Sequence, residues 1–223
     1  DTVDFPTGKQ TYVLKGKIST DFDSDTLIAA STTPNTDWTS ITGDVSGASI
    51  TAANTGTVTG PSMTVKRAAV IIALASTPTS QKVIRGAQGF TFANIIFDSG
   101  SSGEDVRFTS AQVQYDAAVA ADLTNCQLYD GTKALNTGTN IQNPSTTGDK
   151  TFTLDNNLTI TKATSKTVAL KCDISKSSTG DYAQWSFSSN ETFGATGLTS
   201  GSSVTPGVAS SSATNAKFTL TGT

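Results

Sequence analysis

A segment near the start of the chain recurs near its end. Residues 12–19 read Tyr-Val-Leu-Lys-Gly-Lys-Ile-Ser, and residues 168–175 read Val-Ala-Leu-Lys-Cys-Asp-Ile-Ser. Three shorter matches follow at nearly the same spacing: Asp25 with Asp181, residues 46–51 with 200–205, and residues 63–65 with 218–220. Self-similarity at a fixed spacing indicates a repeated structural unit. It restricts the fold more than any single motif in this chain does.

The two copies differ in length. Residues 1–65 match only the second half of the repeat, whereas residues 66–223 are long enough for a complete copy. The sequence therefore predicts a partial repeat in residues 1–65 and a complete repeat in residues 66–223. Half a repeat leaves strand edges unpaired and its core unfilled, so we expect something to cover it.

The composition favours strands over helices. Only 15% of the residues are charged and there is one Met, while Thr, Val, Ile and Phe recur in short runs. Residues 152, 154, 158 and 160 are apolar and share one parity, which is typical of a strand with one buried face. Gly, Pro, Asn, Asp and Ser separate the strands that we predict, which are residues 69–75, 89–97, 106–115, 123–129, 132–135, 151–160, 167–174, 182–187 and 217–220. This spacing predicts an all-β fold, an antiparallel β-sandwich.

Three segments of the complete copy resemble a known class of repeat. Residues 103–110, 123–131 and 166–171 are similar to tandem immunoglobulin-like (Ig-like) or fibronectin-like repeats of large bacterial surface proteins. The similarity extends over roughly residues 80–205 and is weaker over residues 8–60. It implies an Ig-like sandwich that serves as a stalk, filament or adhesin module outside the cell or on its surface, and it implies no catalytic residues.

Charge and residue content exclude several functions. A net charge of -3 and a pI of about 4.8 offer no attractive field to nucleic acid. The chain has no apolar run of 18 residues, so we expect no membrane insertion. It also has no histidine, which removes the commonest general base and every Ser/His/Asp or Cys/His arrangement. We therefore expect no enzyme activity.

The two cysteines fall on predicted strands of the complete copy. Cys126 shares parity with Leu128, and Cys172 shares parity with Leu170, so both thiols should point inward. We predict that they form a disulfide within one sheet or between sheets; the alternative is two unpaired buried thiols. Two cysteines without histidine provide too few ligands for a zinc site. In the partial copy Gly16 stands at the position of Cys172.

Asp21, Asp23 and Asp25 form a run of alternating acids that suits a calcium site. The alternative is an ordinary solvated loop, because the Gly and Glu of a helix-flanked calcium loop are absent. No other cofactor is expected. A second acidic cluster, Asp98, Glu104 and Asp105, flanks a loop rich in Ser and Gly and allows the same two interpretations.

The chain could bind glycans or carry them. Trp38 lies in a polar loop, where an exposed indole could stack on a sugar ring, whereas Trp185 has the parity of a core residue. Asn157 and Asn190 begin Asn-X-Thr triplets, which are glycosylation sites in form.

The leading hypothesis is a non-catalytic extracellular structural protein, a subunit of a filament, S-layer or adhesin stalk. Three explanations of the partial copy remain open. The chain is a fragment of a longer array of repeats, the partial copy docks on the complete one, or a neighbouring subunit completes it head-to-tail by strand complementation. The partners would then be further copies or neighbouring repeats. The alternative function is a carbohydrate-binding or host-binding module of a secreted protein.

Overall fold

The computed structural model describes residues 3–19, 22–187, 190–209 and 216–221. The chain forms two compact units, Asp1–Val65 (unit 1) and Lys66–Thr223 (unit 2). The division falls where the sequence matches place the start of the complete copy. No helix in the described residues is both long enough and apolar enough to cross a bilayer.

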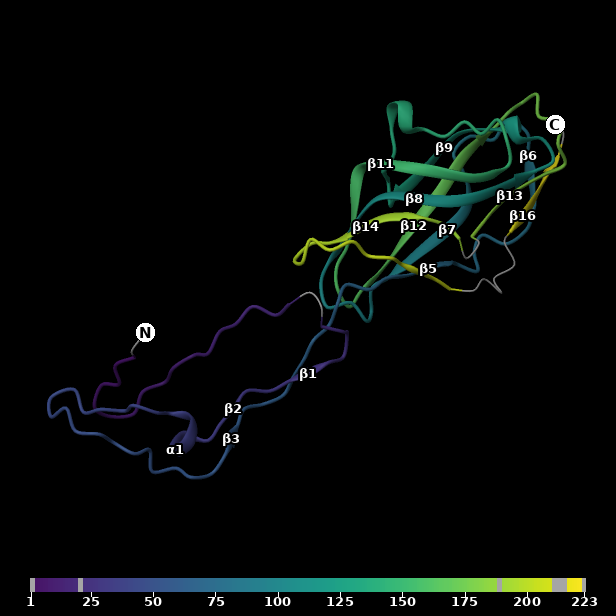
Figure 1. Ribbon diagram of the computed structural model, residues 1–223. Helices are drawn as coiled ribbons and strands as arrows, with labels where there is room; N and C mark the ends of the chain where they lie inside the picture. Colours follow the sequence, from purple (N-terminus) through teal and green to yellow (C-terminus); the bar gives the residue numbers. More distant parts are fainter. Residues whose placement is uncertain (1–2, 20–21, 188–189, 210–215, 222–223) are drawn as a thin grey trace. The chain divides into compact units, whose positions relative to one another are not determined.

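Unit 2 is a β-sandwich of two mixed sheets (Figure 1). One sheet has the strand order β10-β9-β12-β7-β5-β15, and the other has the order β11-β8-β13-β16-β6, with β14 also paired to β8. The strands of the first sheet are β5 (Ile71–Leu74), β7 (Phe90–Asp98), β9 (Leu123–Asp130), β10 (Lys133–Ala134), β12 (Ser165–Ile174) and β15 (Gly207–Val208). Those of the second are β6 (Lys82–Ile84), β8 (Val106–Ala117), β11 (Gly148–Ile160), β13 (Tyr182–Ser186), β14 (Phe193–Gly197) and β16 (Lys217–Thr221).

Two strand pairs depart from the expected antiparallel arrangement. β15 runs parallel to β5, and β16 runs parallel to β6. Each pair joins a strand from the beginning of unit 2 to one from its end. A parallel pair needs a long connection between its strands, and the rest of the unit provides it.

Aromatic side chains pack between the two sheets and fill the core. Phe97 of β7 meets Phe108 of β8 with ring centroids 4.9 Å apart, and Phe92 of β7 meets Phe218 of β16 at 5.1 Å. Trp185 is buried, as its parity predicts. Such ring pairs add to the stability that the burial of apolar area already provides.

Strand β8 contains a bulge at the point where the apolar alternation of its sequence changes phase, between Phe108 and Val113. Gly194 pairs with Ser110 and Ala195 with Phe108, so Thr109 has no partner in this register. The extra residue restores Ala111 and Val113 to the buried face, since a strand without a bulge would turn them outward.

Unit 1 contains only short elements. They are the strands β1 (Leu27–Ile28), β2 (Ser31–Thr32), β3 (Val58–Thr59) and β4 (Met63–Thr64), and the one-turn helix α1 (Pro34–Asp37). β1 pairs with β4 and β2 pairs with β3, both antiparallel. Extended chain without regular pairing makes up most of the rest (Figure 1).

The β1–β4 pair of unit 1 has the hydrogen bonding of the β13–β16 pair of unit 2. Leu27 faces Thr64 in the first, and Tyr182 faces Thr219 in the second, at equal sequence spacing. The amide of Val65 donates to the carbonyl of Thr26 at 2.9 Å, and the amide of Leu220 donates to that of Asp181 at 2.9 Å. The backbone thus equates Asp181 with Thr26, one residue beyond the Asp25 that the sequence match suggests.

A turn in each unit repeats the same hydrogen bonds. In unit 1 the amide of Gly43 donates to the carbonyl of Ala48 at 2.9 Å, and the amide of Gly47 donates to that of Gly43 at 2.7 Å. In unit 2 the corresponding bonds run from Gly197 to Ser202 at 2.9 Å and from Gly201 to Gly197 at 3.0 Å. Gly47 and Gly201 have φ of 64° and 71°, a conformation that favours glycine.

Candidate functional site

Residues 12–19 form no strand in unit 1, although their match in unit 2 is a central one. β12 bonds to β7 on one side and to β9 on the other. Both partners come from residues 66–156, the first half of unit 2. A strand cannot satisfy its backbone groups without neighbours. The segment therefore has the sequence of an inner strand but no sheet to enter within the described part of unit 1.

Unit 1 lacks a core. None of its described residues, 3–19 and 22–65, is buried. Leu14 is 86% exposed, whereas its match Leu170 is 0% exposed. Ile18 is 49% exposed, whereas Ile174 is 3% exposed. We call residues 12–19 together with the turn of residues 43–48 the open face of unit 1.

The aromatic residues of unit 1 lie together. Phe5 stacks on Trp38 with ring centroids 5.9 Å apart. The Phe5 and Tyr12 rings pack edge to face with centroids 4.8 Å apart. The Trp38 indole donates a hydrogen bond to the Thr32 hydroxyl at 3.0 Å. Each of the three rings is about half exposed. Phe5 thus shares the stacking surface of Trp38, the residue that the sequence suggests for glycan contact.

Glu104, in the first half of unit 2, holds the turn of residues 197–202 in place. Its carboxylate accepts hydrogen bonds from the amides of Thr199 at 2.6 Å and Ser200 at 2.8 Å, and from the Ser200 hydroxyl at 2.6 Å. Partial burial raises the pKa of Glu104, but these bonds outweigh it and hold the pKa below its ordinary value of 4.5. A Cβ at Gly197 would overlap the Glu104 carboxylate, so a larger residue there would displace the carboxylate from the turn.

Replacing Glu104 by glutamine is expected to lower the free energy of unfolding of unit 2 by about 1 kcal/mol near neutral pH. Glutamine retains only one carbonyl oxygen where the carboxylate accepts with both. Because the folded-state pKa is lowered, the carboxylate stabilises the fold above pH 4.5 and loses this effect as the pH falls through the folded-state pKa. Denaturant titrations of wild type and variant should converge at acid pH. Asp149→Asn on β11 is the control, and an equal gap at every pH would contradict the expectation.

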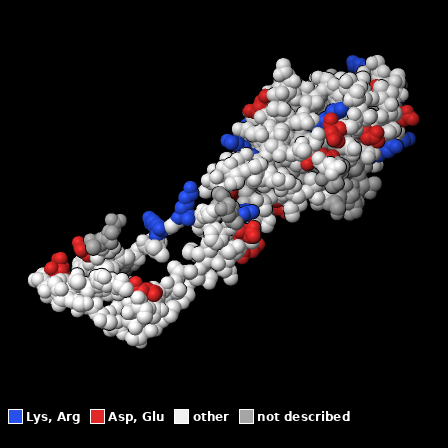
Figure 2. Space-filling view, in the orientation of Figure 1, with Lys and Arg blue, Asp and Glu red and all other residues white. Residues whose placement is uncertain are grey.

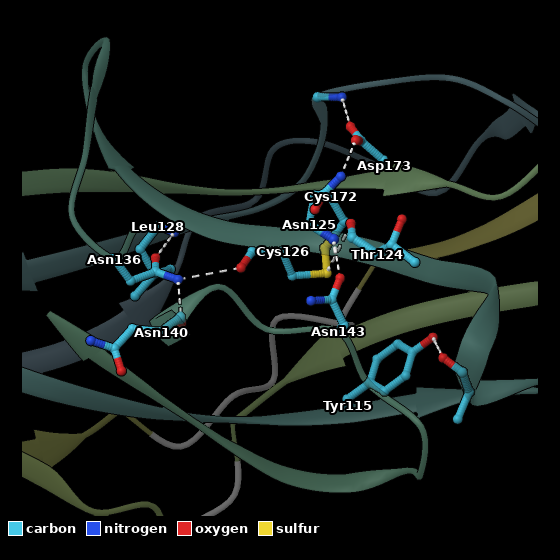
Figure 3. Close-up of a disulfide and its surroundings, with 12 residues drawn as sticks. Tyr115, Thr124, Asn125, Cys126, Leu128, Asn136, Asn140, Asn143, Cys172 and Asp173 are labelled. Carbon is cyan, nitrogen blue, oxygen red and sulfur yellow. Dashed lines mark hydrogen bonds between the residues drawn. A yellow bond between two sulfur atoms is a disulfide. The ribbon is translucent and has the colours of Figure 1, made fainter. Parts of the chain in front are cut away.

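Cys126 and Cys172 form a disulfide that links adjacent strands β9 and β12 of one sheet (Figure 3). Both residues are 0% exposed, as their parity predicts. The bond is therefore a link within a sheet, one of the two arrangements that the sequence leaves open. It joins the first half of unit 2 to the second.

Two asparagine side chains near the disulfide form hydrogen bonds, Asn136 with backbone groups and Asn125 with a carboxylate (Figure 3). Asn136 is buried, accepts from the Leu128 amide at 2.7 Å and donates to the Asn140 carbonyl at 2.9 Å. Asn125 has φ of 51° and donates to the Asp173 carboxylate at 2.8 Å. Neither residue stands out in the sequence, because a single Asn in a strand (Asn125) or in a loop (Asn136) has no periodic signal.

The structure does not gather the acidic residues into a metal site. Asp21 lies outside the described residues, and Asp23 and Asp25 are exposed. Among residues 3–19, 22–187, 190–209 and 216–221, no three carboxylate or cysteine side chains are placed to hold a metal ion. Calcium binding stays a prediction.

Both predicted glycosylation residues are on the surface. Asn157 is exposed on β11 and Asn190 is exposed in a turn. Glycosylation at Asn157 and Asn190 stays a prediction.

Charged side chains are scattered over the visible face of each unit, without one acidic or basic patch (Figure 2).

No protein-family model matches the chain, and no curated protein matches it. Among solved structures, the seventh ScaB type I cohesin from Pseudobacteroides cellulosolvens is similar with a TM-score of 0.36 and 12% sequence identity. The match covers 70% of this chain and 94% of the cohesin. Similarity at this level supports no inference about function, and the fold assignment rests on the strand pairing within unit 2.

Proposed function

We propose that the protein is a non-catalytic structural module of an extracellular surface assembly, such as a filament, S-layer or adhesin stalk. The observation that carries the proposal is the open face of unit 1. A half-repeat with no buried residue among residues 3–19 and 22–65, joined in sequence to a complete repeat, is an element that requires a partner. Strand addition at such a face is a known way for β-proteins to join.

The rest of the chain agrees with this role. The buried residues of unit 2 form one apolar core that includes a disulfide, as suits an extracellular domain. The carboxylate of Glu104 is engaged with a turn. The absence of histidine from the sequence removes the commonest catalytic base.

The test is self-association of the pure chain. Light scattering after gel filtration should show oligomers that grow from micromolar to millimolar concentration, and negative-stain images should show them as elongated. Leu14→Asp, in the open face, should suppress association, because it places a charge among the apolar side chains that a partner would cover. Ile84→Asp, at an exposed apolar residue of unit 2, is the matched control. A monomer at all concentrations would contradict self-assembly.

The alternative function, carbohydrate binding, depends on Trp38. The ring is 47% exposed, but Phe5 stacks on it and its indole N–H already donates to Thr32. A sugar could therefore stack on only one face of the Trp38 ring and could not accept a hydrogen bond from its indole N–H. Glycan-array binding that Trp38→Ala abolishes would favour this alternative over the structural role.

A further inference from the structure

We propose that the open face of unit 1 binds a further first-half segment, of the type that residues 66–156 form in unit 2. This inference rests on the proposed structural role and names the partner that completes unit 1. The segment precedes unit 1 along a polypeptide, in the order that the two halves have in unit 2. There β11 crosses from the first half into the second without a break.

The elements present in unit 1 are those that a second half can form alone. The β1–β4 pair and the turn of residues 43–48 need only residues of the same half, and both have their counterparts in unit 2. The segment of residues 12–19 needs β7 and β9, which a second half does not contain, and it forms no strand. The missing partner is thus a pair of strands like β7 and β9.

The turn of unit 1 presents the donors that bind Glu104 in unit 2. By position, the amides of Val45 and Ser46 and the Ser46 hydroxyl correspond to the three donors of Thr199 and Ser200. Among the described residues, nothing accepts a hydrogen bond from the amide of Val45 or Ser46. A partner with a carboxylate at the position of Glu104 fits these groups, and charged hydrogen bonds of this kind are strong.

A lysine of the open face also has a counterpart. Lys171 of β12 places its ammonium group 4.8 Å from the ring centre of Tyr129 on β9. Lys15 occupies the matching position in residues 12–19. A first-half segment would bring an aromatic ring to Lys15 in the same way, a cation–π contact that residues 1–65 do not provide for it within the described structure.

Exchange between copies of this chain cannot complete every unit. Each chain holds two second halves, residues 1–65 and 157–223, but one first half, residues 66–156, which is already paired with its own second half. If one copy lends its first half to the unit 1 of another, its own unit 2 opens. Completing both units of every chain therefore requires additional first-half segments. A first-half segment on the same polypeptide as unit 1 would be present at a high effective concentration.

The experiment adds a copy of residues 66–156 directly before residue 1 of the full chain. Hydrogen exchange measured by mass spectrometry then reports on residues 12–19. Exchange of these amides should slow on the order of a hundredfold relative to the chain without the addition, because they enter a sheet. The matched control adds residues 157–223 at the same place. This is a second half and should give no protection.

Two further measurements make the outcome decisive. Exchange at segments that occur once in each protein checks that unit 2 is folded: β13 (Tyr182–Ser186) in the protein with the added first half, and β7 (Phe90–Asp98) in the control. Glu104→Gln in the added copy should speed exchange at the turn of residues 43–48 while residues 12–19 stay protected.

Equal exchange of residues 12–19 with either addition would overturn the proposal. That result would leave the structural role standing if the chain still self-associates through Leu14. A chain that stays monomeric, while the added first half protects residues 12–19, would support the proposal and contradict self-assembly alone.

Discussion

Replacing Cys126 and Cys172 together by alanine is expected to lower the free energy of unfolding of unit 2 by about 4 kcal/mol. The two residues are 46 apart in sequence, so the bond closes a long loop in the unfolded chain and reduces its conformational entropy. Both side chains are fully buried, and alanine leaves no unpaired polar group in their place. The corresponding fall in melting temperature is about 8–16 °C for a unit of this size.

Calorimetry of the oxidised protein, the reduced protein and the double variant tests this expectation. The reduced protein and the variant should melt close together and well below the oxidised protein. Unit 1 has no cysteine, so any signal from it should be unchanged. A loss below about 1 kcal/mol would contradict the entropic argument, because it would mean that the unfolded chain already keeps the two strands close together.

Periodicity predicts the long strands of unit 2 well, because one face of each is buried. The alternation in residues 165–174 places Leu170 and Cys172 inward, and the shift of phase in β8 identifies the bulge at Thr109. These signals are strong since a slip of one residue would expose the apolar side chains.

Three short strands of unit 2, β6, β14 and β15, could not be predicted in the same way. β6 has three residues and β15 has two, too few for an alternating pattern. β14 contains Gly194 and Gly197, which read as loop residues. Their pairing depends on partners far along the chain, as with the parallel contact of β15 to β5, and a local pattern does not contain that information.

Residues 12–19 show a different limit of sequence reasoning. By their match to residues 168–175, Leu14 and Ile18 correspond to the buried Leu170 and Ile174, yet the described structure leaves both side chains exposed. The sequence of residues 12–19 is suited to a buried inner strand. Such a strand forms only when neighbouring strands are present to pair with it. A segment that matches an inner strand but forms no strand of its own therefore points to a binding partner.

Leu170→Ala and Leu14→Ala form a matched pair that measures this difference. Leu170 is 0% exposed, so its truncation should cost unit 2 about 2–5 kcal/mol through lost apolar contact and a residual cavity. Leu14 is 86% exposed, so its replacement by alanine should change the free energy of unfolding of the chain by no more than about 0.5 kcal/mol. Chemical denaturation of both variants tests the contrast. Once a first-half segment covers residues 12–19, Leu14→Ala should become costly in the manner of Leu170→Ala, whereas a cost that stays near zero would mean that Leu14 belongs to no core.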